Sequence, residues 1–240
     1  MYEDLKSEVI FWAQKAEKLG LVVPTTGNFS LRDKETGYIF VTPHGIFREF
    51  LNPDDIVVLD IKGNKIEGKN RPSYETPVHL EIYKNREDIF GIAHTHSPYA
   101  ACFAVLNKNI PLIHIETFFS VGGDIPVVDF ALPGSEELAK KSLEKLSNRS
   151  AVLLENHGVL AIGKSLSQAI IVAILVEETA KIYHRSLQVG EPKNLSDLQV
   201  GGLKEILKKI WYLIKYLILL ILYIDSINFI AIIIKLIHKI

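Results

Sequence analysis

Residues 90–108 read FGIAHTHSPYAACFAVLNK and join a strand pattern to a helix pattern. The run FGIAH at 90–94 is apolar and β-prone. The stretch that follows, residues 97–108, predicts a helix, because Ser97 is a favoured N-cap residue and Pro98 suits the first helical turn. Strand and helix therefore alternate in this part of the chain.

A second stretch, AVLLENHGVLAIG at residues 151–163, contains two apolar runs broken by Glu-Asn-His-Gly. It predicts a strand, a tight turn and a second strand, with the polar break as a place for chemistry. Ser165 and Ser167 are candidate N-caps of a long helix that runs to about residue 188. The alternation of strands and helices therefore extends to the end of this helix.

The remaining elements are predicted from apolar spacing and from the turn residues between them. They are helices over 2–19, about 76–86 and 135–149, and β-prone runs at 29–32, 38–42, 56–61 and 125–130. The first three β-prone runs suggest an antiparallel meander. We therefore predict one α+β or α/β/α layered domain over residues 1–195.

Residues 196–240 form a tail of different composition, dominated by Ile, Leu, Tyr and Lys. From residue 203 onward the chain carries six lysines and only two acids. Lys215 and Asp225 interrupt the apolar run, whereas a membrane-spanning helix needs about 20 apolar residues with little charge. We expect a tail that does not span a bilayer and is buried against neighbouring subunits, with disorder or aggregation as the alternative.

Composition excludes several classes of protein. The formal net charge of −1 leaves no basic surplus for a nucleic-acid-binding protein. Cys102 is the only cysteine, so an intrachain disulfide is impossible and a cytoplasmic location is expected. Cys102 lies in an apolar run and is expected to fill the core. The N-terminal stretch lacks the basic-then-apolar layout of a signal peptide, so export is not expected.

Three histidines and one glutamate form a candidate metal site. Side chains alternate between the two faces of a strand, so His94 and His96 lie on the same face and can bind one ion. His157 lies in the turn between two apolar strands, and Glu75 begins a predicted helix. Three imidazoles and a carboxylate that can leave suit a catalytic Zn²⁺, with one ion per chain. By itself, Glu75 would be read as an acid favoured at a helix N-terminus.

Five short motifs then occur together in order and spacing. They are GNFS at 27–30, TPHG at 42–45, PSYE at 72–75, HTHS at 94–97 and NHG at 156–158. On these motifs the chain, over about residues 5–190, resembles the class II aldolase and adducin-head family. The resemblance implies a three-layer α/β/α sandwich with a central, mainly antiparallel sheet. It also implies a homotetramer with active sites between subunits.

The resemblance further implies a chemistry. The zinc ligands of the family map onto His94, His96 and His157, and Glu75 maps onto the residue that both touches the metal and serves as acid/base. The implied reaction is the reversible cleavage of a ketose 1-phosphate, similar to fuculose 1-phosphate, to dihydroxyacetone phosphate and a small aldehyde such as lactaldehyde. A metal fits this reaction because it stabilises the enediolate that forms beside the carbonyl.

The phosphate end of the substrate needs backbone N–H groups and small hydroxyl donors in a concave turn. The residues that match the family's phosphate loops are Thr26, Gly27, Asn28, His44, Gly45 and Ser73. Taken singly, each is an ordinary turn residue. Only their joint register with the metal motifs favours a phosphate site.

Some positions depart from the family pattern. His44 stands where a small hydroxyl residue is common, and Tyr74 replaces a second serine, so the phosphate pocket is altered. A family tyrosine that assists protonation would fall at Ile115, so that aid is missing unless Glu116 or a residue from elsewhere replaces it. His79, four residues after Glu75, is either a support for the site or an ordinary satisfied histidine.

Other functions stay open on the same fold. A sugar-phosphate 4-epimerase or a dehydratase would use the same three-histidine site and related chemistry. A non-catalytic, adducin-like binding module is less favoured, because such modules need not keep the metal ligands.

Overall fold

The computed structural model describes residues 2–237, and it describes the side-chain surroundings up to residue 219. The chain forms two compact units, Met1–Asn194 and Leu195–Ile240. The second unit consists of one long helix, α7 (Asp197–Ile237). The last three residues of the tail, 238–240, lie outside the described residues. Within the described part, no helix has both the length and the apolar character needed to cross a bilayer.

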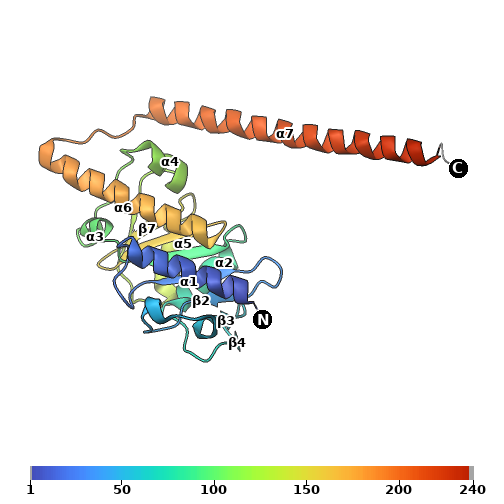
Figure 1. Ribbon diagram of the computed structural model, residues 1–240. Coiled ribbons are helices and arrows are strands. Elements are labelled where there is room, and N and C mark those ends of the chain that lie inside the picture. Colours follow the sequence, from blue (N-terminus) through green and yellow to red (C-terminus); the bar gives the residue numbers. More distant parts are fainter. Residues whose placement is uncertain (1, 238–240) are drawn as a thin grey trace. The chain divides into compact units, whose positions relative to one another are not determined.

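The first unit is built on an eight-stranded sheet with the order β4-β3-β2-β1-β5-β8-β7-β6. Figure 1 shows β2, β3 and β4 next to one another at one end of this sheet. Its strands are β1 (Asn28–Arg32), β2 (Ile39–Val41), β3 (Val57–Leu59), β4 (Lys65–Glu67), β5 (Gly91–Thr95), β6 (Val127–Val128), β7 (Ala151–Leu154) and β8 (Gly158–Gly163). Strands β1 to β3 form the predicted antiparallel meander, and β4, which was not predicted, extends it by one strand.

The sheet is mixed, which corrects the expectation of a mainly antiparallel sheet. Strand β6 runs parallel to β7, while the other neighbouring strands pair antiparallel. Parallel neighbours need a crossover connection, and helix α5 (Glu136–Lys145) supplies it between these two strands. Strand β6 has only two residues, so its apolar run could not indicate whether it pairs parallel or antiparallel.

Helices cover both faces of the sheet. Residues of α1 (Glu3–Lys18), α3 (Pro98–Ala104) and α6 (Leu166–Val189) share one apolar cluster with strand residues such as Phe29 and Ala93. Residues of α2 (Thr76–Asn85) and α5 form a second cluster with Ile92 and Leu160. Successive strand residues thus point to opposite helical layers.

The region after β5 differs from its prediction. Helix α3 ends at Ala104, not near residue 108, because Asn107 adopts a left-handed φ of 48° and the Lys108 N–H donates to the Phe103 carbonyl at 3.0 Å. Cys102 is exposed on this helix, so the expectation that it fills the core is wrong. Its position faces away from the cluster that holds Phe103.

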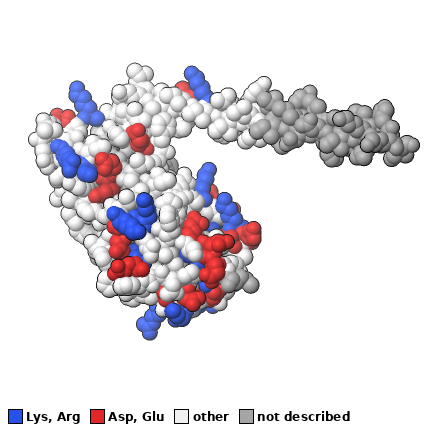
Figure 2. Space-filling view, in the orientation of Figure 1, with Lys and Arg blue, Asp and Glu red and all other residues white. Residues whose placement is uncertain are grey.

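Charged side chains are interspersed on the visible face of the first unit. Figure 2 shows basic and acidic groups next to one another on this face. This mixture agrees with the net charge of −1 and differs from the single-signed patch of a nucleic-acid-binding surface.

Candidate metal centre

The sheet brings three histidines to one place. His94 lies in β5, opposite Leu160 of β8, and His96 follows immediately after the strand. His157 lies in the short turn from β7 to β8, where Asn156 takes a left-handed φ of 55°. The turn packs tightly on β5, since a Cβ on Gly158 would lie 2.2 Å from the Thr95 carbonyl oxygen. Only glycine permits this approach.

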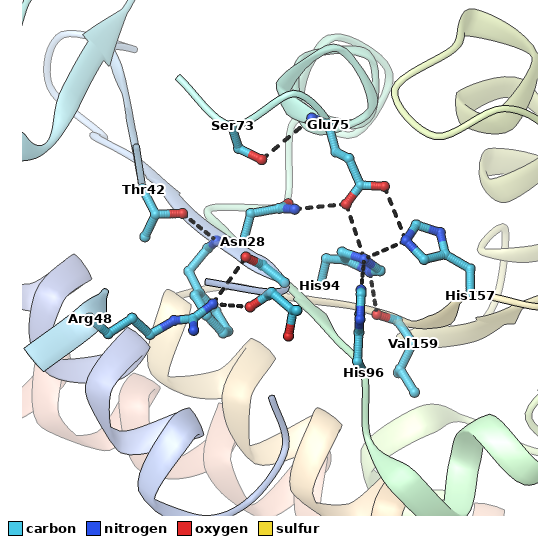
Figure 3. Close-up of polar contacts among 12 residues, drawn as sticks. Asn28, Thr42, Arg48, Ser73, Glu75, His94, His96, His157 and Val159 are labelled. Atoms are coloured by element: carbon cyan, nitrogen blue, oxygen red, sulfur yellow. Dashed lines mark hydrogen bonds and ion pairs between the residues drawn. The ribbon is translucent and has the colours of Figure 1, made fainter. Parts of the chain in front are cut away.

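The imidazole Nε2 atoms converge (Figure 3). His94 Nε2 lies 3.1 Å from His96 Nε2 and 3.2 Å from His157 Nε2. Glu75 stands at the start of α2, with Oε2 3.0 Å from His94 Nε2 and Oε1 3.3 Å from His157 Nε2. The four side chains predicted as metal ligands therefore meet in one cluster.

The cluster has the donor chemistry of a zinc site. The Val159 carbonyl can only accept, so at 2.9 Å it takes a hydrogen bond from the Nδ1–H of His94, and Nε2 is the ring atom left to bind a metal. Two nitrogens bound at about 2.05 Å to a tetrahedral Zn²⁺ stand about 3.3 Å apart. The observed separations of 3.1 and 3.2 Å are close to this value. The residues present therefore fit a metal ion.

The ionisation states suit metal binding. Burial, followed by the neighbouring His94, lowers the pKa of His96 and of His157 to about 4, so both rings are neutral near pH 7. Burial alone would raise the pKa of Glu75, but the contacts with His94, His157 and Asn28 outweigh it and hold that pKa well below its usual range.

Strand β1 supports Glu75. Asn28 is the partner of His94 in the β1–β5 register, so both side chains lie on the α2 side of the sheet. The Asn28 amide donates from Nδ2 to Glu75 Oε2 at 2.7 Å. Asn28, predicted as a phosphate contact, thus also orients the carboxylate.

The segments predicted to bind phosphate lie beside this cluster. The Ser73 N–H donates to the Thr42 carbonyl at 3.2 Å, and the His44 N–H donates to the Arg71 carbonyl at 3.0 Å. The Ser73 hydroxyl accepts from the Glu75 N–H at 3.4 Å. His44 and Gly45 are exposed. The turns at 42–45 and 71–75 are therefore joined to each other. The contact between Ser73 and Glu75 places them next to Glu75 (Figure 3).

Arg48, which lies in none of the five motifs, holds the third segment. Its side chain is buried, and the guanidinium donates to the Thr26 carbonyl and, at 3.1 Å, to the Gly27 carbonyl. It also pairs with Glu17 at 3.2 Å. A single arginine in the run IFREF at 46–50 carries no motif, so no pattern of residue types marks this role.

Other candidate residues lie elsewhere or serve differently. His114 is the N-cap residue of helix α4 (Ile115–Val121), and its Nδ1 lies 3.1 Å from Glu116 Oε2, so these two side chains contact each other. Tyr74 is exposed. His79 is buried behind Glu75, and burial lowers its pKa to about 3, which keeps the ring neutral.

Comparison with known proteins identifies the family. Residues 7–184 match the model of the class II aldolase and adducin N-terminal domain. A 5-deoxy-D-ribulose 1-phosphate aldolase of Bacillus thuringiensis serovar kurstaki is 34% identical over 198 residues, which is 82% of this chain and 92% of that protein. An L-fuculose phosphate aldolase of Methanococcus maripaludis strain C5 is 36% identical over 170 residues, 71% of this chain and 90% of that protein.

The fold agrees with these matches. A solved structure of an L-fuculose 1-phosphate aldolase superposes with a TM-score of 0.82 at 37% identity, covering 87% of this chain and 98% of that one. The family resemblance seen in the five motifs is thereby confirmed. The chain belongs to the class II aldolase and adducin family, and it is one of the enzymes of that family, the aldolases, which are lyases.

Proposed function

We propose that the chain is a zinc-dependent aldolase that reversibly cleaves a ketose 1-phosphate to dihydroxyacetone phosphate and a small aldehyde. One Zn²⁺ per chain is held by His94, His96 and His157, with Glu75 beside it. The observation that carries the proposal is the convergence of three Nε2 atoms with a carboxylate oxygen 3.0 Å from His94 Nε2.

The groups of this site have different proposed roles in the reaction. A bound Zn²⁺ would supply the positive charge that stabilises the negative charge developing on substrate oxygens. Glu75 is ionised, so it can accept a proton from the substrate and return it. Asn28 keeps the carboxylate turned toward the histidines through its 2.7 Å hydrogen bond. Acid/base catalysis and charge stabilisation thus lie on adjacent groups.

The phosphate group is proposed to lie against the turns at 26–28, 44–45 and Ser73. Gly27 and Gly45 have φ of 68° and 70°, a conformation that can aim successive N–H groups into a concave turn. Arg48 supports this site from behind by fixing the carbonyl side of the first turn.

Product analysis tests the reaction. Zinc-loaded protein is incubated separately with fuculose 1-phosphate, 5-deoxyribulose 1-phosphate and ribulose 1-phosphate, and products are identified by mass spectrometry. The first two sugars are chosen because similar proteins are named for them. An aldolase releases dihydroxyacetone phosphate and an aldehyde. Recovery of an isomer or a dehydrated sugar, with no cleavage, would instead support the epimerase or dehydratase.

Assembly and location are further parts of the proposal. We propose a homotetramer in the cytoplasm, on the family resemblance and on the single Cys102. Light scattering measures the mass of the full chain. Cell fractionation compares the full chain with a version ending at Asn194, and recovery of only the full chain in carbonate-resistant membranes would make the tail an anchor.

A further inference from the structure

His79 belongs to a buried network on the far side of Glu75. Its Nδ1 lies 2.7 Å from the Ser30 hydroxyl, which lies 2.9 Å from the Tyr83 hydroxyl. The Tyr83 hydroxyl also reaches the Ser30 carbonyl at 3.1 Å. His79 and Tyr83 are each about 1% exposed. The imidazole is thus fixed at one edge, and the proposed metal site uses no atom of it.

Two buried polar atoms next to this network lack partners. His79 Nε2 and Asn28 Oδ1 have no hydrogen-bond partner within the part of the chain that the structure describes. Buried polar atoms in folded proteins are nearly always paired with protein or ordered water. Both residues belong to the neighbourhood of Glu75, since Asn28 donates its other amide atom to that carboxylate.

The two residues line the same small cavity. Its polar wall is formed by Asn28, Glu75, His79 and His94. Its apolar wall comes from Val78 and from three leucines of α5, β7 and β8, which are Leu138, Leu154 and Leu160. About 10 Å³ is open to the centre of a water-sized molecule, which is room for about one water.

We propose that one buried water molecule bridges His79 Nε2 and Asn28 Oδ1 in this cavity, and that His79 is thereby a positioning residue for Glu75. Water both donates and accepts, so it satisfies the Asn28 oxygen and also meets Nε2 in either tautomer of the neutral ring. The cavity, the two unpartnered atoms and the network that fixes the ring together carry this assignment.

The bridge determines which way the Asn28 amide faces. With its oxygen held by the water, the amide presents Nδ2 to Glu75 Oε2. Turned over, it would place its oxygen against the carboxylate, and two acceptors repel. Loss of the bridge therefore frees the carboxylate to leave its working orientation. This catalytic consequence rests on the proposed function of Glu75, whereas the water site itself does not.

A crystal structure of the full chain at high resolution tests the water site directly. We expect one ordered water within about 2.7–3.2 Å of both His79 Nε2 and Asn28 Oδ1. A dry cavity, or a protein atom bonded to Nε2, would overturn the proposal. This measurement needs neither activity nor a variant that folds.

Three substitutions of one residue test the positioning role. His79→Gln keeps a polar group near Nε2, His79→Asn keeps one near Nδ1 for Ser30, and His79→Leu keeps neither. We expect Asn and Leu to lower kcat by roughly 10- to 100-fold, as supporting residues do, with zinc content and KM near wild type, while Gln recovers most of kcat. Equal kcat in all three variants and wild type would refute the role.

A matched control separates positioning from general stability. Tyr83→Phe removes a hydroxyl from the same buried network and leaves the 2.7 Å contact between Ser30 and His79 in place. We expect a lower Tm and an unchanged kcat. If wild-type protein cleaves no ketose 1-phosphate, the proposed function fails, and the water in the crystal structure still decides the site.

Discussion

Replacing Glu75 with glutamine tests the acid/base role most sharply. The amide has nearly the shape of the carboxylate and cannot take up a proton. Its oxygen must face Asn28, because the Asn28 Nδ2 donor lies 2.7 Å from the present Oε2. Its NH₂ group then occupies the Oε1 position, 3.3 Å from His157 Nε2. Three imidazoles still remain for the metal, so zinc is expected to stay.

The size of the effect follows from this geometry. General acid/base groups contribute roughly 100- to 10,000-fold to the rate. Such a loss corresponds to about 2.7 to 5.4 kcal/mol of transition-state stabilisation. Because phosphate contacts and the histidines are unchanged, we expect the loss in kcat, with KM within a few-fold of wild type.

The assay measures aldol cleavage and zinc content on the same preparations. Glu81→Gln is the matched control, because Glu81 lies on the same helix and pairs at 3.5 Å with the exposed Lys84. We expect the control to equal wild type. A loss of only a few-fold in Glu75→Gln, with zinc fully retained, would refute the reasoning and make Glu116 the next candidate.

Three further results are expected. His157→Ala loses stoichiometric zinc in elemental analysis, whereas His184→Ala keeps it. Gly27→Ala lowers both Tm and zinc affinity, because its Cβ would lie 2.6 Å from the His94 carbonyl oxygen. Gly20 has a similar φ of 73° and open space around it, so Gly20→Ala costs only the backbone strain of roughly 1–2 kcal/mol. In denaturant titrations with a chelator, the free energy of unfolding falls as the pH drops from about 6.5 to 4. His96 and His157 take up protons in the unfolded chain over this range, whereas in the folded chain their pKa values are about 4.

The elements that bury an apolar face could be predicted from the sequence. Helix α1 was expected over 2–19 and runs from Glu3 to Lys18. Strand β4 was missed, because Lys65 and Ile66 are exposed on an edge strand, where no alternation with a core is required. Helix α4 was missed because seven residues are too few to show a helical period.

The convergence of the three histidines could also be predicted, because two physical rules act locally. Alternation along β5 places His94 and His96 together, and a polar turn between buried strands isolates His157. The ionisation of Glu75 could not be predicted in this way. Its pKa depends on three side chains from other segments, and the sequence does not give their distances.

The parts of the site that the sequence did not give are contacts between distant segments. Arg48 reaches carbonyl groups 21 and 22 residues away, and His79 reaches a serine 49 residues away. Backbone carbonyls carry no residue identity, so no pattern of residue types could mark them as the partners of Arg48. The proposed buried water likewise corresponds to no residue type in the sequence. The candidate ligands of this site can therefore be predicted from short motifs, whereas the groups that orient them depend on how the strands and α2 pack.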